Sequence, residues 1–311
     1  MPITQPDLPL RVLNCFQLSG VGFLVLHEEE KVGTADLISD VDIAINMPVH
    51  TALDLACQSL AESGVVIALV WPYDVGGGAS VFFSDPEGEN GAQIDALYDL
   101  RGSGRYGLRS DRFFPRQQVG FRYPTPDRLD ALLYVARKAA VKGKRFELDQ
   151  ACKTITSAFA VHLVQDRVRT LFSSSAARSL LRTLRGGQPR WNLRPVRWVK
   201  SFMRLLERLR RPIGYWVHIA GPGAEETALA LESRFGRWLV NASSGRSPTG
   251  LAAMFWWATV VMPVRWRPAV FFSYSENRLR WPQPDMILSS SPTNASLASS
   301  IVAAMAQKAT R

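Results

Sequence analysis

The sequence predicts an α/β protein in three parts: a mixed sheet backed by helices, a helical middle region and a smaller C-terminal α/β unit. Three observations predict this. Short apolar runs bounded by turn residues fill residues 21–98, amphipathic helical spacing dominates after Pro126, and an apolar strand followed by a glycine turn and a helix begins at Gly214. We expect the parts at residues 1–110, 111–211 and 212–311.

The first part is predicted to contain five strands and one helix. Apolar and β-branched residues mark the strands at 21–27, 40–45, 65–71, 79–83 and 93–98. Residues 50–63 carry apolar side chains at helical spacing, and the pattern ends at Gly64. This order of elements predicts a small mixed sheet with helices packed against it.

The middle part is predicted to be helical. Residues 127–140 form an amphipathic pattern with Asp127 as the N-cap, and the helical character continues over residues 148–163. Residues 172–178 and 185–192 have the Ser, Gly and Pro content of loops, and residues 196–209 form a further predicted helix with a basic face.

The third part is predicted to start with a strand, a glycine turn and an amphipathic helix over residues 214–235. A second parallel strand is expected after Pro284, followed by a helix at 295–306. Residues 247–264 carry no charge, but their continuous apolar run of about a dozen residues is shorter than the roughly 20 that a membrane span needs. We therefore expect a buried helix there.

Composition limits the class of protein. Three cysteines form no Cys-x-x-Cys pair, and four histidines lie scattered without metal-ligand spacing, so a disulfide framework and a zinc site are not favoured. The N-terminal residues show no secretory signal, and we expect a cytoplasmic protein.

The net charge of +10 comes from one segment, Arg178–Arg211, which holds eleven basic residues and one acid, Glu207. The rest of the chain is neutral, so general nucleic-acid binding is not favoured. Two roles stay open for this segment: a reversible, peripheral contact with an anionic membrane surface, or packing of arginine stems over apolar neighbours between domains.

Three aspartates stand out as candidate metal ligands. Asp40 and Asp42 lie two residues apart in a predicted strand and therefore share a face, and Asp95 lies in another predicted strand. Three carboxylates together form an oxygen cage that suits Mg²⁺, which takes its other ligands from phosphates and water. An acidic pair at a strand end is also common in solvated turns, so the pair alone is not specific.

Several short motifs, in this order, resemble a family of bacterial proteins often encoded among surface-polysaccharide genes. These proteins join a nucleotidyltransferase-like domain to a thymidylate-kinase-like P-loop domain. The motifs are Phe23–Glu30, Ser39–Ile43, Gln93–Leu97, Arg101–Tyr106, Arg210–Gly223 and Arg278–Leu288. The resemblance implies a nucleotidyltransferase-like mixed sheet, a helical region with a basic linker helix, and a P-loop kinase-like α/β domain.

The resemblance also implies an activity: Mg²⁺-dependent transfer from a nucleoside triphosphate to a small hydroxylated acceptor, a sugar or lipid-linked sugar, in cell-envelope polysaccharide biosynthesis. Asp40, Asp42 and Asp95 would hold the metal, and Asp95 would also help to deprotonate the acceptor hydroxyl. The alternative is a non-catalytic scaffold or regulatory protein of envelope assembly.

Two departures from the family pattern change what we expect. A working P-loop is Gly-x-x-x-x-Gly-Lys-Ser/Thr, whereas Gly221–Thr227 is one residue short and carries Glu225 and Glu226 in place of Gly-Lys. Losing the lysine alone costs about 1.5–3 kcal/mol of phosphate binding, and the added negative charge costs more. We therefore expect a degenerate domain without kinase activity. Gly33-Thr34 lies too close to Asp40 to serve as the family's Gly-Ser triphosphate grip.

Overall fold

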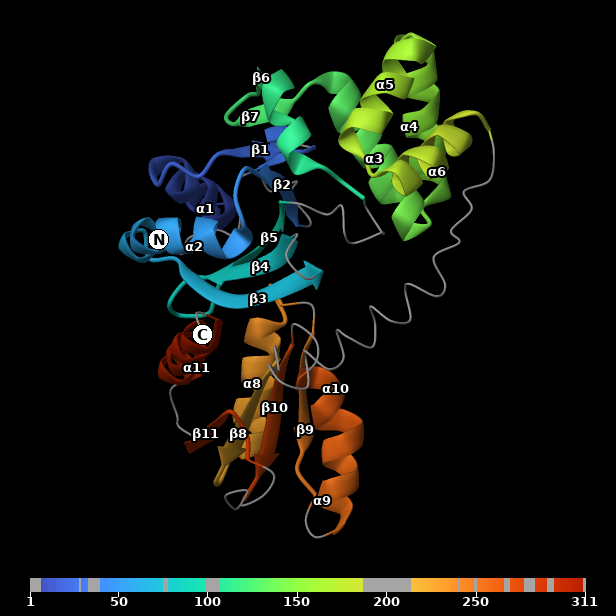
Figure 1. The fold of residues 1–311 in the computed structure, drawn as a ribbon. Helices are drawn as coiled ribbons and strands as arrows, with labels where there is room; N and C mark the ends of the chain where they lie inside the picture. Colours follow the sequence, from blue (N-terminus) through green and yellow to red (C-terminus); the bar gives the residue numbers. More distant parts are fainter. Residues whose placement is uncertain are drawn as a thin grey trace.

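The protein is a mixed α/β structure with helices and three sheets, one of which is entirely parallel (Figure 1). This computed structural model describes residues 7–27, 29–32, 40–74, 78–98, 107–186, 214–239, 241–248, 251–265, 269–276, 283–289 and 294–309. The mixed α/β class predicted from the sequence is confirmed.

The first sheet has five strands in the order β1-β2-β5-β4-β3. Their bounds are β1 (Phe23–Val25), β2 (Val41–Ile45), β3 (Val66–Asp74), β4 (Gly78–Ser84) and β5 (Gly91–Leu97). Strands β2 and β5 are parallel, and every other neighbouring pair is antiparallel. All five strands fall where the apolar runs predict them.

Two helices, α1 (Asp7–Leu18) and α2 (Val49–Glu62), cover one face of this sheet. Val41, Ile43 and Ile45 of β2 share a core with them. Ala44, the next side chain on the opposite face, packs instead with the helical middle part. Because side chains alternate along a strand, Asp42 lies on this second face, toward the helices that follow.

The middle part contains α3 (Arg128–Lys142), α4 (Arg145–Ala158), α5 (Val161–Leu171) and α6 (Ser174–Leu184). Asp127 is the N-cap of α3, as predicted, and its Oδ1 accepts a hydrogen bond of 2.9 Å from the Asp130 amide. Two 3₁₀ turns, η3 (Ser110–Arg112) and η4 (Phe114–Arg116), come before α3. The short strands β6 (Gln117–Val119) and β7 (Pro124–Pro126) follow these turns and form a hairpin that leads into α3.

Two sequence expectations for this part are wrong. The helical pattern at 148–163 is two helices, because the backbone is extended at Phe159 and Ala160. The loop expected at 172–178 is instead the start of α6, with Ser173 at its N-cap position. Serine is common both in turns and at helix starts, so the three serines did not distinguish a loop from a helix N-terminus.

The C-terminal part is a four-stranded parallel sheet in the order β11-β8-β10-β9. Its strands are β8 (Tyr215–Ala220), β9 (Ala242–Arg246), β10 (Val270–Ser275) and β11 (Met286–Ser289). Helices α8 (Ala224–Phe235) and α11 (Asn294–Ala309) cover one face. The other face packs on α9 (Leu251–Trp256), the π-helical η5 (Trp257–Val261) and α10 (Met262–Arg265).

Of the uncharged segment at 247–264, residues 251–264 are helical, as expected, but this helical stretch is buried on one side only. Val261 packs against Trp216 and Phe271 of the sheet, while Met254 and Phe255 are exposed. Among the residues that the structure describes, no helix combines the length and the hydrophobicity that a membrane crossing requires.

The two sheets are joined by a common core, in which Ala68, Leu69 and Phe82 of β3 and β4 pack with α8 and α11 (Figure 1). The indole of Trp238 donates a hydrogen bond of 3.2 Å to the Gly88 carbonyl. A Cβ on Gly91 would lie 2.2 Å from this indole, so only glycine allows the start of β5 to approach the indole so closely.

Candidate metal centre

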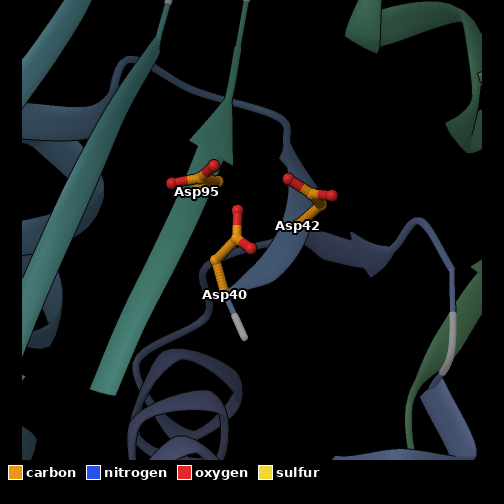
Figure 2. A group of neighbouring side chains, drawn as sticks. All are labelled: Asp40, Asp42 and Asp95. Carbon is orange, nitrogen blue, oxygen red and sulfur yellow. The ribbon is translucent and has the colours of Figure 1, made fainter. Parts of the chain in front are cut away.

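The three predicted ligands converge where the parallel strands β2 and β5 run side by side. Asp42 and Asp95 are direct partners in the register of the two strands, and Asp40 lies one residue before β2. One carboxylate oxygen from each residue lies within 4.8 Å of the others. Figure 2 shows the three side chains turned toward one another.

The donor set fits a hard divalent cation. All three ligands offer carboxylate oxygens, and opposite oxygens in a Mg²⁺ octahedron lie about 4.2 Å apart, twice the metal–oxygen distance of about 2.1 Å. Three ligands of one octahedral ion include at least two adjacent pairs, whose oxygens lie about 3.0 Å apart. The three carboxylates, which lie within 4.8 Å of one another, would therefore have to draw closer around the ion. Three carboxylates leave the remaining positions for water and phosphate oxygens.

Asp95 is held in place by its neighbours on the sheet. Its Oδ1 accepts hydrogen bonds of 2.7 Å from the Ser80 hydroxyl on β4 and of 2.9 Å from the Gln93 amide on its own strand. Only 6% of Asp95 is exposed, and a buried carboxylate is stable only when such partners replace water. One oxygen is thereby anchored, and the carboxylate keeps a fixed direction.

Asp42 is paired with groups from outside the sheet. Its Oδ2 forms an ion pair with the ammonium of Lys138 on α3 and lies 2.5 Å from Nε2 of His27, which follows β1. The ring of His27 stacks on Tyr134 of α3, with the ring centroids 6.0 Å apart. Helix α3 therefore closes the acidic cluster from the side opposite α1 and α2.

The electrostatics of the cluster follow from this arrangement. Burial is the largest influence on Asp40 and opposes its ionisation, but the hydrogen bond with Asp95 and the positive charges of Lys138 and Lys142 outweigh it and lower the pKa of Asp40 to about 2. Burial also opposes the charge on Lys138, yet the three carboxylates raise the pKa of its ammonium above the usual value.

These shifts define the charge state at neutral pH. Asp40 is ionised, and Lys138 carries a proton and neutralises Asp42. A divalent cation would take over the neutralising role of Lys138, so the cluster is suited to replace the lysine charge with a metal charge.

Sequence reasoning missed the residues that surround the aspartates. His27 was considered only as one of four scattered histidines without metal-ligand spacing, and Lys138 received no role. One signal was present: Tyr134, Lys138 and Lys142 follow one another at intervals of four residues, which places them on one face of α3. No local pattern shows that this face lies against the strand that carries Asp42.

The glycine turn after β8 has the geometry of a helix start. Gly223 has φ +75° and is the N-cap of α8, and Glu225 and Glu226 lie in the first turn. Oε1 of Glu225 accepts a hydrogen bond of 2.9 Å from the Tyr274 hydroxyl. Acidic side chains stabilise a helix N-terminus but repel a phosphate at the same place.

Several sequence expectations lie outside the described residues. They are the Gly33-Thr34 pair, the segment at 101–106, the residues at 278–282 and the basic helix at 196–209. Of the basic segment Arg178–Arg211, the described arginines are Arg178, Arg182 and Arg185, and all three are exposed. They lie opposite the buried Ala176, Ala177 and Leu180, which pack into the helical core.

Comparisons of the chain with protein-family models, with curated proteins and with solved structures found no match.

Proposed function

We propose that this protein is a Mg²⁺-dependent nucleotidyltransferase that acts on a small hydroxylated acceptor, a sugar or lipid-linked sugar, in cell-envelope polysaccharide biosynthesis. The observation that carries this proposal is the convergence of Asp40, Asp42 and Asp95 on a parallel strand pair. The proposal includes a nucleotidyltransferase-like fold for the first sheet and a degenerate, P-loop kinase-like fold for the parallel sheet.

Each residue of the cluster has a separate role in this reaction. Asp40 and Asp42 hold Mg²⁺, which when bound supplies positive charge to the phosphates of the nucleoside triphosphate. Asp95 completes the ligand set and accepts the proton of the acceptor hydroxyl. Ser80 and Gln93 fix the direction in which Asp95 points.

In the proposed transfer, each bond that forms is matched by a bond that breaks. The acceptor oxygen forms a bond to the α-phosphorus, the bond from that phosphorus to the bridging oxygen breaks, and pyrophosphate leaves with the electron pair. Lys138 neutralises Asp42 before the cation binds, and its ammonium then becomes available to the phosphate oxygens. The positive charge of Lys142, which already acts on Asp40, adds to the attraction for a triphosphate.

The C-terminal part has no place in this chemistry. Glu225 and Glu226 occupy the positions at which a P-loop needs glycine and lysine, and Glu225 is fixed by Tyr274. We propose that this part is a relic without kinase activity, which packs against β3 and β4 through α8 and α11.

One observation favours a second function. Because Lys138 already pairs with Asp42, the acidic cluster is partly neutralised without a metal. This is the arrangement expected if the protein is a non-catalytic scaffold or regulatory protein of envelope assembly that has kept the acids only as a structural ion-pair network.

Thermal unfolding distinguishes the two functions. We expect Mg²⁺ or Mn²⁺ together with ATP or CTP to raise the Tm, because a ligand at 100 times its Kd stabilises the folded state by about 2.7 kcal/mol. The variant Asp95→Asn should lose this shift, while Asp54→Asn, an exposed acid on α2, should keep it. An unchanged Tm with every nucleotide and both metals, or an equal shift in Asp95→Asn, would favour the scaffold.

A further inference from the structure

A cavity adjoins the acidic cluster on the side of His27. It has a volume of about 370 Å³ and lies between the end of β1, the β6–β7 hairpin and the first turn of α3. His27 lines this cavity, and Nε2 of the same ring lies 2.5 Å from Asp42 Oδ2. The volume falls in the range of small-molecule sites, and one imidazole ring connects it to the proposed metal ligands.

The hairpin wall of this cavity is preformed. The carboxylate of Glu29 is buried and accepts hydrogen bonds from the amides of Phe121, Arg122 and Tyr123, at 2.6–2.8 Å. A Cβ on Gly120 would lie 2.2 Å from the Tyr123 carbonyl oxygen, so the turn is as close as backbone atoms allow. The negative charge of Glu29 is thus paired with backbone amides of the hairpin, and these hydrogen bonds hold the shape of the hairpin without a ligand.

Three polar side chains at this cavity have unused hydrogen-bonding capacity. Within the described residues, the side chains of Gln118, Thr125 and Arg128 make no hydrogen bond or ion pair, and all three line the cavity. Gln118 and Thr125 each offer a donor and an acceptor, which matches hydroxyl groups. Arg128 offers a planar cation whose paired N–H groups match a phosphate.

An aromatic ring completes the lining. Phe121 is 76% exposed at the hairpin, although it lines the cavity, and the guanidinium of Arg122 lies 5.6 Å from its ring centroid. Single exposed apolar side chains are common on protein surfaces, but a ligand that covers this ring would gain free energy by burying its apolar area. The apolar C–H face of a sugar ring would cover such a ring while its hydroxyls reach neighbouring polar groups.

We propose that this cavity binds the acceptor and that the acceptor carries a sugar phosphate group. The sugar ring lies against Phe121, its hydroxyls bind Gln118 and Thr125, and the phosphate binds Arg128. His27 is a positioning residue, because it touches both the cavity and Asp42. This inference rests on the proposed function, since the acidic cluster beyond His27 is what makes a bound hydroxyl reactive. The group belongs either to a free hexose 1-phosphate or to the headgroup of a lipid-linked sugar.

Calorimetric titration without nucleotide or metal tests this proposal. The probes are the 1-phosphates of glucose, galactose and mannose, and an undecaprenyl-diphosphate-linked N-acetylglucosamine in detergent micelles. We expect binding of at least one probe, and Arg128→Gln should weaken it roughly tenfold or more, because a charged hydrogen-bond partner is lost. Arg145→Gln, which removes an exposed arginine from the first turn of α4, should not weaken it. Binding of the free or the lipid-linked probe identifies the source.

The outcomes separate this proposal from the proposed function. If a metal–nucleotide complex binds but none of the probes does, the acceptor site is wrong and the nucleotidyltransferase proposal stands. If a probe binds in an Arg128-dependent way and Asp95→Asn leaves that binding unchanged, the cavity assignment stands even where nucleotide binding fails. Equal weakening in Arg128→Gln and Arg145→Gln would overturn the assignment, since it would show a general charge effect. Unchanged Tm values of both variants exclude unfolding as the cause.

Discussion

Replacing Asp42 by asparagine is expected to lower the affinity of the protein for Mn²⁺ by at least about 100-fold. Loss of a residue that only supports a metal ligand typically costs 10–100-fold, and Asp42 is itself a proposed ligand. The substitution also leaves the charge of Lys138 without its nearest carboxylate. Electron paramagnetic resonance of free Mn²⁺ during a protein titration measures the affinity directly.

Two further variants control this experiment. Asp54→Asn removes an exposed carboxylate on α2, which covers the opposite face of the sheet, and should leave Mn²⁺ binding unchanged. Lys138→Met removes the competing ammonium, so it should strengthen Mn²⁺ binding without nucleotide and weaken binding of the Mn²⁺–nucleotide complex. An Asp42→Asn variant with native affinity would show that the metal, if bound, lies elsewhere.

Replacing Asp130 by alanine is expected to destabilise the protein by about 3–5 kcal/mol, the usual cost of leaving one member of a buried ion pair without its partner. Asp130 is fully buried on α3, and its Oδ1 accepts a hydrogen bond of 2.8 Å from Nε of Arg167 on α5. A second guanidinium nitrogen of Arg167 contacts Oδ2, so the pair is bidentate and links the two helices.

Urea unfolding of Asp130→Ala measures this cost, and the exposed ion pair between Asp166 and Arg169 supplies the matched control. These side chains are 72% and 64% exposed, so Arg169→Ala should change the free energy of unfolding by less than about 1 kcal/mol. A loss of less than 1 kcal/mol in Asp130→Ala would contradict the view that this pair holds α3, and with it Lys138, in place.

The strands of both sheets illustrate what a sequence can predict. Strands β1 to β5, β8 and β11 were predicted because each is a short apolar run bounded by Gly, Pro or charged residues. Strands β9 and β10 were missed, and β10 lies between β8 and β9 in the sheet. Its serines at 273 and 275 interrupt the apolar pattern, and one of them is buried through hydrogen bonds to Trp216 and His218 that only the fold supplies.

Helix α1 was missed for a different reason. Pro6 and Pro9 near its start favour a loop by composition. Proline is nevertheless tolerated in the first turn of a helix, where its missing N–H has no intrahelical acceptor. Burial of Leu8, Val12, Leu13 and Phe16 against the sheet then stabilises the helix, and this tertiary contact is not visible in the local sequence.

Of the residues in the candidate site, only the three aspartates were predicted from the sequence. The spacing of Asp40 and Asp42 fixed their common face, but their approach to Asp95 depends on β5 lying next to β2 rather than next to β3. Lys138 lies 96 residues after Asp42 in the chain, and His27 lies 15 residues before it, yet both contact Asp42 in the fold. Such contacts depend on how α3 packs on the sheet, and periodicity does not determine that packing.

Anomalous diffraction from crystals grown with Mn²⁺ and a non-hydrolysable analogue of ATP or CTP tests the metal centre most directly. We expect a peak between Asp40, Asp42 and Asp95, at about 2.0–2.3 Å from one oxygen of each residue. The ammonium of Lys138 should have left Asp42 and should contact a phosphate oxygen. A map without a peak among the three carboxylates, with Lys138 still paired to Asp42, would contradict the proposed metal site and the nucleotidyltransferase function.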